Sequence, residues 1–97
     1  MRLGILIINS AYKDFILPVL RAASMRGDQV EIFIMDEGCP ITGDPEFQEL
    51  ARGKDVRSTI CDLNRRQRGM EAPLEVKIGS QFDNARMVHE CEKILVF

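Results

Sequence analysis

The sequence is poor in aromatic residues and in histidine: its 97 residues include no Trp, one Tyr and one His. The core of the folded chain must therefore be largely aliphatic. The single histidine, His89, forms no His-x-x-x-His pair, and the three cysteines form no Cys-x-x-Cys pair. A glycine-rich phosphate loop is also missing. Because zinc sites need several such ligands at short spacing, we expect no metal and no other cofactor.

The chain also lacks a basic excess and a long apolar run. Its net charge is -2 at pH 7, whereas a nucleic-acid-binding domain is strongly basic. No apolar stretch reaches the length of a membrane span, and the first one, residues 3–8, is too short for the core of a signal peptide. The odd number of cysteines, without a pairing pattern, fits a reducing compartment. We therefore expect a cytoplasmic protein with free thiols and with no nucleic-acid or membrane partner.

Short aliphatic runs alternate along the chain with helix-forming segments. Residues 3–8 form an almost unbroken run of the kind found in strands that are buried on both faces of a parallel sheet. Gly27 is placed to end the first helix as a C-cap. The expected strands are 3–8, 29–35, 56–61, 74–78 and 93–97, and the expected helices are 13–26, 46–52, 62–68 and one from 81 or 83 to 92.

This alternation predicts right-handed βαβ units in a single α/β domain, residues 1–97, with helices on both faces of a parallel sheet. A domain of this size buries only about two-thirds of the surface that its unfolded chain exposes. We therefore expect a second subunit to cover part of its apolar surface.

Ligands of open parallel sheets bind beyond the carboxyl ends of the strands. The rule selects residues 9–12, 36–40, 61–66 and 79–81, and in the first segment Asn9, Ser10 and Tyr12 are candidates for binding a substrate. One serine without neighbouring glycines is a weak signal for phosphate. Cys61 is the strongest candidate, because it ends a predicted strand and directly precedes a predicted helix.

The surroundings of Cys61 act in opposite directions on its thiol. A helix start and nearby cations favour the reactive thiolate, and Arg65 follows four residues later. Asp62 opposes it, because an adjacent carboxylate disfavours a second negative charge. The alternative interpretation is that Cys61 is a small buried hydrophobic residue at a strand end.

Three further side chains are candidates near Cys61. Cys39, in the loop after the second strand, is a possible second thiol that resolves an oxidised Cys61 or receives sulfur from it. Otherwise it is a loop cysteine without a partner. Arg65 and Arg66 are candidates for holding an anionic sulfur species. The alternative is that they belong to a solvated helix face.

Four segments together resemble the DsrE/DsrF-like family of sulfur-relay proteins, which includes the TusD type. They are the first strand and loop at 3–10, the helix, glycine cap and second strand at 22–33, the cysteine-to-glycine segment at 61–69, and the ending at 91–97. The resemblance covers nearly the whole chain, and its specificity lies in the order and spacing of short motifs. Asp62, the run 64–66 and the pair 39–40 depart from the family pattern.

The resemblance implies a flavodoxin-like three-layer α/β/α sandwich with a five-stranded parallel sheet. It also implies a homo-oligomer, as a dimer, trimer or hexamer, and a sulfur relay that carries sulfane sulfur as a persulfide on Cys61. The partners would be sulfur donor and acceptor proteins or small sulfur species. The departures from the pattern leave the donor and the acceptor open.

Two hypotheses about function follow. In the first, Cys61 carries or transfers persulfide sulfur, as a sulfurtransferase or sulfur carrier. In the second, the chain is a non-catalytic, oligomeric binding module that holds a small anion or nucleotide at the strand carboxyl ends. The solvent exposure of Cys61 discriminates between them: a fully buried thiol with no facing cleft favours the second.

Overall fold

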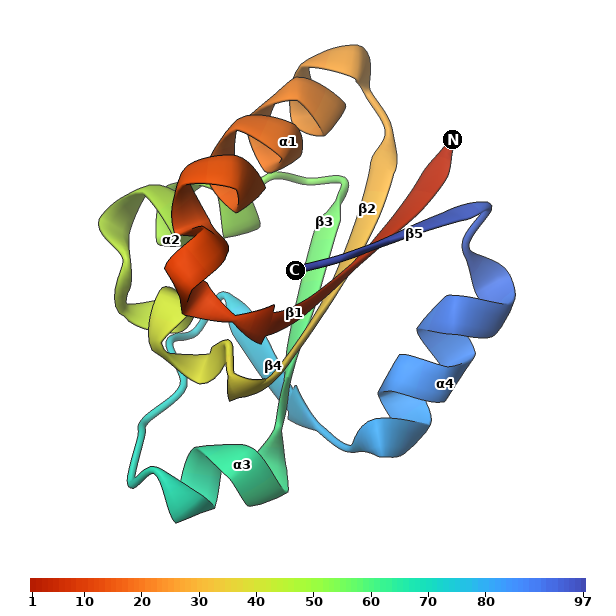
Figure 1. Cartoon of the computed structure of the whole chain (residues 1–97). Coiled ribbons are helices and arrows are strands. Elements are labelled where there is room, and N and C mark those ends of the chain that lie inside the picture. Colours follow the sequence, from red (N-terminus) through yellow and green to blue (C-terminus); the bar gives the residue numbers. More distant parts are fainter.

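The computed structural model describes all 97 residues as five strands and four α-helices (Figure 1). The strands are β1 (Arg2–Asn9), β2 (Gln29–Glu37), β3 (Val56–Cys61), β4 (Val76–Gly79) and β5 (Lys93–Val96). The α-helices are α1 (Lys13–Arg26), α2 (Pro45–Ala51), α3 (Asp62–Gln67) and α4 (Gln81–Glu90), and short 3₁₀ turns span Ser10–Tyr12 and Cys39–Gly43. None of the helices is both long and apolar enough to cross a membrane.

All five strands are parallel and lie in the order β4-β3-β2-β1-β5. The predicted flavodoxin-like three-layer sandwich with a five-stranded parallel sheet is confirmed. The sequence prediction did not specify the strand order. Flavodoxin itself has the order 2-1-3-4-5, whereas here β1 to β4 follow one another across the sheet and β5 returns to the far side of β1.

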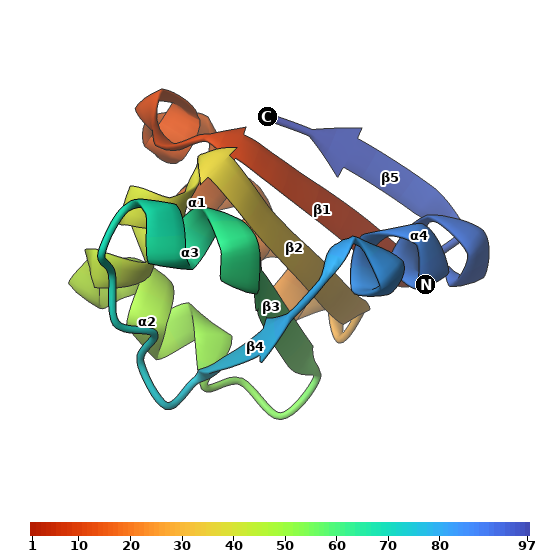
Figure 2. The same cartoon turned by 90° about the horizontal axis from the view of Figure 1, so that it is seen from below.

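The strand order explains which helix covers which face. Right-handed crossovers from β1 to β2 and from β2 to β3 place α1 and α2 on one face of the sheet. The return from β4 to β5 runs in the opposite direction and places α4 on the other face, over β1 and β2. The short helix α3 lies at the carboxyl edge of the sheet (Figure 2).

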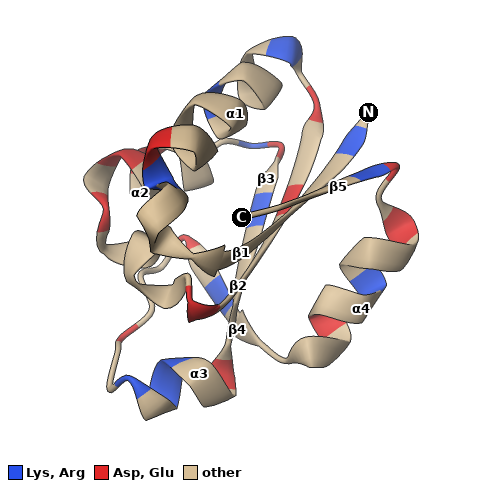
Figure 3. Ribbon diagram, in the orientation of Figure 1, with Lys and Arg blue, Asp and Glu red and all other residues tan.

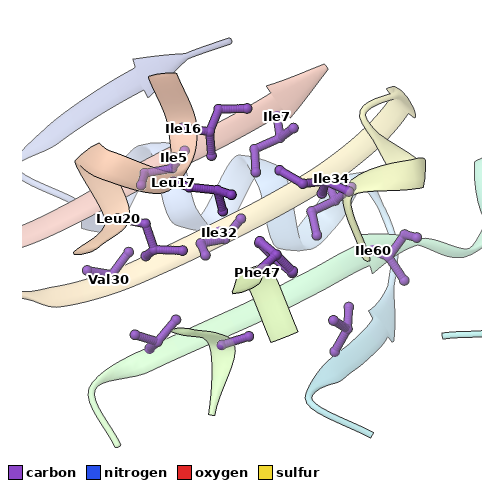
Figure 4. Packing of buried hydrophobic residues seen from close by; sticks show 14 of the residues in the cluster. Ile5, Ile7, Ile16, Leu17, Leu20, Val30, Ile32, Ile34, Phe47 and Ile60 are labelled. Atoms are coloured by element: carbon purple, nitrogen blue, oxygen red, sulfur yellow. The ribbon is translucent and has the colours of Figure 1, made fainter. Parts of the chain in front are cut away.

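The two faces bury very different amounts of apolar surface. Beneath α1 and α2, 17 buried residues form the main core, with Ile5, Ile32 and Phe47 near its centre (Figure 4). A second cluster contains three buried residues, Phe33, Cys61 and Met87. Because strand side chains alternate between faces, Phe33 and Cys61 point toward the side covered by α4. That face is covered by one helix only.

Several predicted elements have the observed boundaries, and others are displaced. The helix over 13–26 and the strand over 56–61 were predicted correctly, and Gly27 ends α1 with a left-handed φ of 78°. The predicted strand 74–78 was placed too early, because Leu74 is wholly exposed and the N–H of Val76 bonds to the carbonyl of Pro73 in a turn. The predicted helix to residue 92 was too long, because the extended backbone of Cys91 (ψ 144°) ends it at Glu90.

The segment that follows β2 also differs from the prediction. The strand continues to Glu37, two residues beyond the expected end at Met35. The expected loop 36–45 contains the 3₁₀ turn Cys39–Gly43, and α2 begins at Pro45. The side chain of Asp44 accepts hydrogen bonds from the N–H groups of Glu46 and Phe47 and so caps this helix. The helix therefore starts one residue before the predicted start at residue 46.

Gly38 lies where this segment passes closest to β1. A Cβ atom at Gly38 would overlap the backbone carbonyl of Ile7, whereas a Cβ atom at Gly43, the last residue of the 3₁₀ turn that follows, would meet nothing within 4 Å. Since φ of Gly38 is -77°, any residue can adopt its backbone conformation. Glycine is required there for space and not for its conformational freedom.

We expect Gly38→Ala to destabilise the fold by about 1–3 kcal/mol, because the added methyl group forces the loop away from β1. Gly43→Ala serves as the matched control and should lie within about 0.5 kcal/mol of the natural chain. Urea unfolding of the three proteins measures the difference. Equal midpoints for the two variants would contradict the close approach.

Candidate functional site

The carboxyl ends of the strands bring together most of the predicted site residues. At the end of β1, the side chain of Asn9 accepts the N–H of Ala11 and caps the turn Ser10–Tyr12. Tyr12 is about half exposed, at 48%. Asn9 lies beside Glu37 in the sheet register, next to an irregularity in the pairing of β1 with β2. Asn9, Ser10 and Tyr12 therefore form one corner of this edge.

Cys61 is the last residue of β3 and the N-cap of α3. Its backbone is extended (φ -62°, ψ 119°), and no side chain caps the helix that follows. The residue is 5% exposed, and its side chain belongs to the cluster with Phe33 and Met87. Cys61 is therefore at the predicted position but is almost entirely covered.

Asp62, which opposes a thiolate on sequence grounds, is held by two arginines of its own helix. Arg65 donates from Nε at 3.2 Å and from Nη2 at 2.8 Å to Oδ1, and Nε of Arg66 lies 3.0 Å from Oδ2. Arg65 also donates to the carbonyl of Met70 at 2.8 Å. The carboxylate is thus compensated locally, and both guanidinium groups already have an anionic partner.

The helix α3 is fastened to the end of β2 by contacts that the sequence analysis missed. Asp36 has a left-handed backbone (φ 50°), and its N–H donates to Oδ1 of Asn64 at 2.9 Å. Nη2 of Arg68 donates to Asp36 at 3.2 Å and to Glu37 at 3.0 Å. Asn64 departs from the pattern of the DsrE/DsrF-like family, and this departure was the sequence signal from which a contact of α3 could have been predicted.

Cys39 is the first residue of the 3₁₀ turn that follows β2. It is completely buried in the main core, and burial raises the pKa of its thiol. Arg68 lowers that pKa, while charge on Cys61 or Asp36 would raise it further. The two loops therefore bring Cys61 close enough for a charge on it to affect the pKa of Cys39. Both cysteines are free thiols. The third cysteine, Cys91, lies outside this group, and burial raises the pKa of its thiol too.

The three principal cavities of the protein lie elsewhere. None of them is lined by Cys61, Asn9, Ser10 or the arginines of α3. No three His, Cys, Asp or Glu side chains are grouped so that they could hold a metal ion. By the criterion of exposure, the covered thiol favours the binding-module hypothesis.

Comparison with known proteins finds the same fold without a related sequence. No family model and no curated protein matches the chain. The chain is similar in structure to the ychN protein of E. coli, a DsrE/DsrF-like family member known from a crystal structure. The TM-score is 0.79 with 14% sequence identity, and the match covers 100% of both chains. At this level of identity the likeness shows the fold alone.

Cys39 should be inert toward alkylating reagents in the folded protein. Its thiol is fully buried, and a raised pKa leaves less thiolate at neutral pH than a free cysteine has. We expect iodoacetamide at neutral pH to label Cys39 only after the chain is unfolded in urea, as measured by peptide mass spectrometry. Labelling of native Cys39 as fast as in urea would contradict its burial.

Loosening α3 should expose Cys61. Asn64→Ala and Arg68→Gln each remove a contact to the end of β2, and each such loss is worth about 1 kcal/mol. A loss of about 1 kcal/mol raises the population of molecules in which α3 is open roughly fivefold. Cys61 should therefore be alkylated roughly fivefold faster in either variant. Gln67→Ala is the matched control, because the side chain of Gln67 accepts a hydrogen bond from Asn64 and forms none with β2. Unchanged rates in the first two variants would show that α3 does not limit access.

Proposed function

We propose that this chain is a small sulfur-relay protein that carries or transfers sulfane sulfur as a persulfide on Cys61. The observation that carries the proposal is the position of this thiol, at the junction of β3 and α3 on the carboxyl edge of the sheet. Ligands of open parallel sheets bind at that edge. The likeness of fold to the DsrE/DsrF-like protein ychN supports it.

The chemistry needs a nucleophilic sulfur and no external oxidant. The Cys61 thiolate attacks the outer sulfur of a donor persulfide, the donor's S–S bond breaks, and the donor leaves as a thiolate. Cys61 then holds a persulfide. Attack of an acceptor thiolate on the terminal sulfur releases Cys61 as a thiolate again. The donor and acceptor are proteins or small sulfur species.

The charges around Cys61 are compatible with this role. Asp62 is bridged by Arg65 and Arg66, so its carboxylate does not stand alone beside the sulfur. Arg66 remains 72% exposed and is the better placed of the two to meet an incoming anion. Arg65 is tied to Asp62 and to the carbonyl of Met70, and it serves to keep the Asp62 charge compensated.

Access is the requirement that the structure imposes on this function. Cys61 is 5% exposed and packs with Phe33 and Met87, so a donor reaches its sulfur only when α3 or α4 moves or when the side chain turns outward. The contacts of Asn64 and Arg68 with the end of β2 hold α3 in place. Sulfur loading is therefore expected to be slow without a partner that displaces α3.

A homo-oligomer is part of the proposal. Large apolar side chains remain exposed on α4 and β5, where Phe82 is 74%, Val88 51% and Val96 59% exposed. A second copy of the chain is the partner expected to cover them. The subunit count stays open between dimer, trimer and hexamer.

The burial of Cys61 favours a second candidate function. In this candidate the chain is a non-catalytic, oligomeric module that holds a small anion or nucleotide at the strand carboxyl ends, near Asn9, Ser10 and Tyr12. Cys61 is then a packing residue beside Phe33 and Met87. Slow alkylation of Cys61 together with binding at this edge would distinguish it from the relay.

Incubation with a persulfide donor, followed by mass spectrometry, tests the relay. We expect the natural chain to gain one sulfur atom on Cys61, and Cys39→Ser and Cys91→Ser to gain it equally. Cys61→Ser should gain none. Because α3 limits access, Arg68→Gln should load faster than the natural chain. Absence of added sulfur in both the natural chain and Arg68→Gln, or equal labelling of Cys61→Ser, would exclude the proposal.

A further inference from the structure

Two adjoining cavities lie on the α4 side of the sheet, in its amino-terminal half and away from Cys61. One has a volume of about 340 Å³ and the other about 510 Å³, and Glu31 and Arg57 line both. Arg57 comes four residues before Cys61 in β3, which places the two about 13 Å apart along the strand. We call this joint depression the basal groove.

The basal groove exists because α4 covers only part of its face. The helix crosses β1 and β2 and leaves the same side of β3 and β4 without a helix. Strand alternation places Arg57 and Thr59 of β3 and Lys77 of β4 on this open side. The sheet therefore presents polar and basic side chains where a second helix would otherwise require apolar ones.

Three guanidinium groups converge on one buried carboxylate in the basal groove. Oε1 of Glu31 lies 3.3 Å from Arg86, 3.6 Å from Arg2 and 3.9 Å from Arg57. The Glu31 side chain is only 10% exposed. Glu90 also holds Arg2 and Arg86, at 3.2 and 3.1 Å. Arg57 is the guanidinium that is least engaged, and its side chain is 76% exposed.

The cations that line the basal groove are unequally paired. Its basic residues are Arg2, Lys54, Arg57, Lys77 and Arg86, and its acidic residues are Glu31, Asp55 and Glu75. Glu90 and Asp83 of α4 add two carboxylates that pair with Arg2 and Arg86, whereas Arg57 and Lys77 have no carboxylate oxygen closer than 3.9 and 4.0 Å and Lys54 forms no ion pair. Glu75 is already neutralised from outside by Arg52, at 2.9 Å. Figure 3 shows the basic segments on β1, β3, β4 and α4 around the acidic segment of β2.

We propose that the basal groove binds a small polyphosphate-bearing molecule. Arg57 belongs to both cavities, with Lys54 on one side and Lys77 and Arg86 on the other, so the cations suit negative charge spread along an extended ligand. Arginine is the side chain best shaped to hold phosphate oxygens. The cavity volumes fall in the range of small-molecule sites.

The lining of the basal groove also defines what it recognises. It contains no aromatic ring, so nothing is placed to stack on a base. The polyphosphate is therefore the recognised part. Pyrophosphate and ADP should bind with similar affinity, and adenosine should not bind. Because the contacts are charged and partly exposed, added salt should weaken binding.

Isothermal titration calorimetry and amide chemical-shift mapping with pyrophosphate, ADP and adenosine test the proposal on the whole chain. Arg57→Gln should weaken binding of pyrophosphate and ADP by about tenfold, the effect of losing one charge-assisted contact. Arg21→Gln is the matched control, because Arg21 is an exposed arginine that pairs with Glu46 on the opposite face. It should bind as the natural chain does. Since Arg57 is largely exposed, the variant should keep its urea midpoint.

Four results would overturn the basal groove as a polyphosphate site, and the first three concern where and what it binds. They are binding that Arg57→Gln leaves unchanged, adenosine binding as well as ADP, and shifts confined to residues 9–12 and 61–66. No detectable binding of pyrophosphate would do the same. Cys61→Ser separates this proposal from the sulfur relay, because that variant should lose sulfur loading and bind pyrophosphate normally.

Discussion

The junction between α3 and the end of β2 decides what the candidate site can do. Asp36 takes a left-handed backbone conformation there, which a non-glycine residue adopts only when its surroundings hold it. Asn64 accepts its N–H, and Arg68 bridges its carboxylate to that of Glu37. These contacts hold α3 at the carboxyl edge of the sheet. Cys61, which directly precedes α3, is 5% exposed, and its side chain packs with Phe33 of β2 and Met87 of α4.

The strand order divides the molecule into two chemically different ends. Since β5 returns past three strands to pair with β1, one long crossover places α4 alone on its face. At the carboxyl end, Met87 of that helix packs on a small apolar cluster that includes the thiol. At the amino end, the face is left open and charged. A covered thiol and an open groove of charged side chains are therefore products of the same topology.

The aliphatic pattern was sufficient to predict the sheet and its helices, because strands buried on both faces have little freedom in composition. Residues 3–8 illustrate this, and they lie in β1 of the structure. The basal groove could not be predicted in this way. It depends on the pairing of Glu31 with Arg2, 29 residues earlier in the sequence, and with Arg86, 55 residues later. The pairing of Asp62 with Arg65 and Arg66, in contrast, follows the i,i+3 and i,i+4 spacing of a helix, and this spacing was the available signal.

The residues that depart from the family pattern have structural roles, and this changes what the departures mean. Asp62 organises the two arginines of α3, and Asn64 anchors the helix to β2. A loss of thiol function would require none of these contacts. In the proposed relay, a thiol that stays covered until a partner arrives needs a helix that is held in place; Asn64 ties α3 to β2, and Asp62 pairs with arginines within α3. In that proposal, the departures bear on when Cys61 reacts.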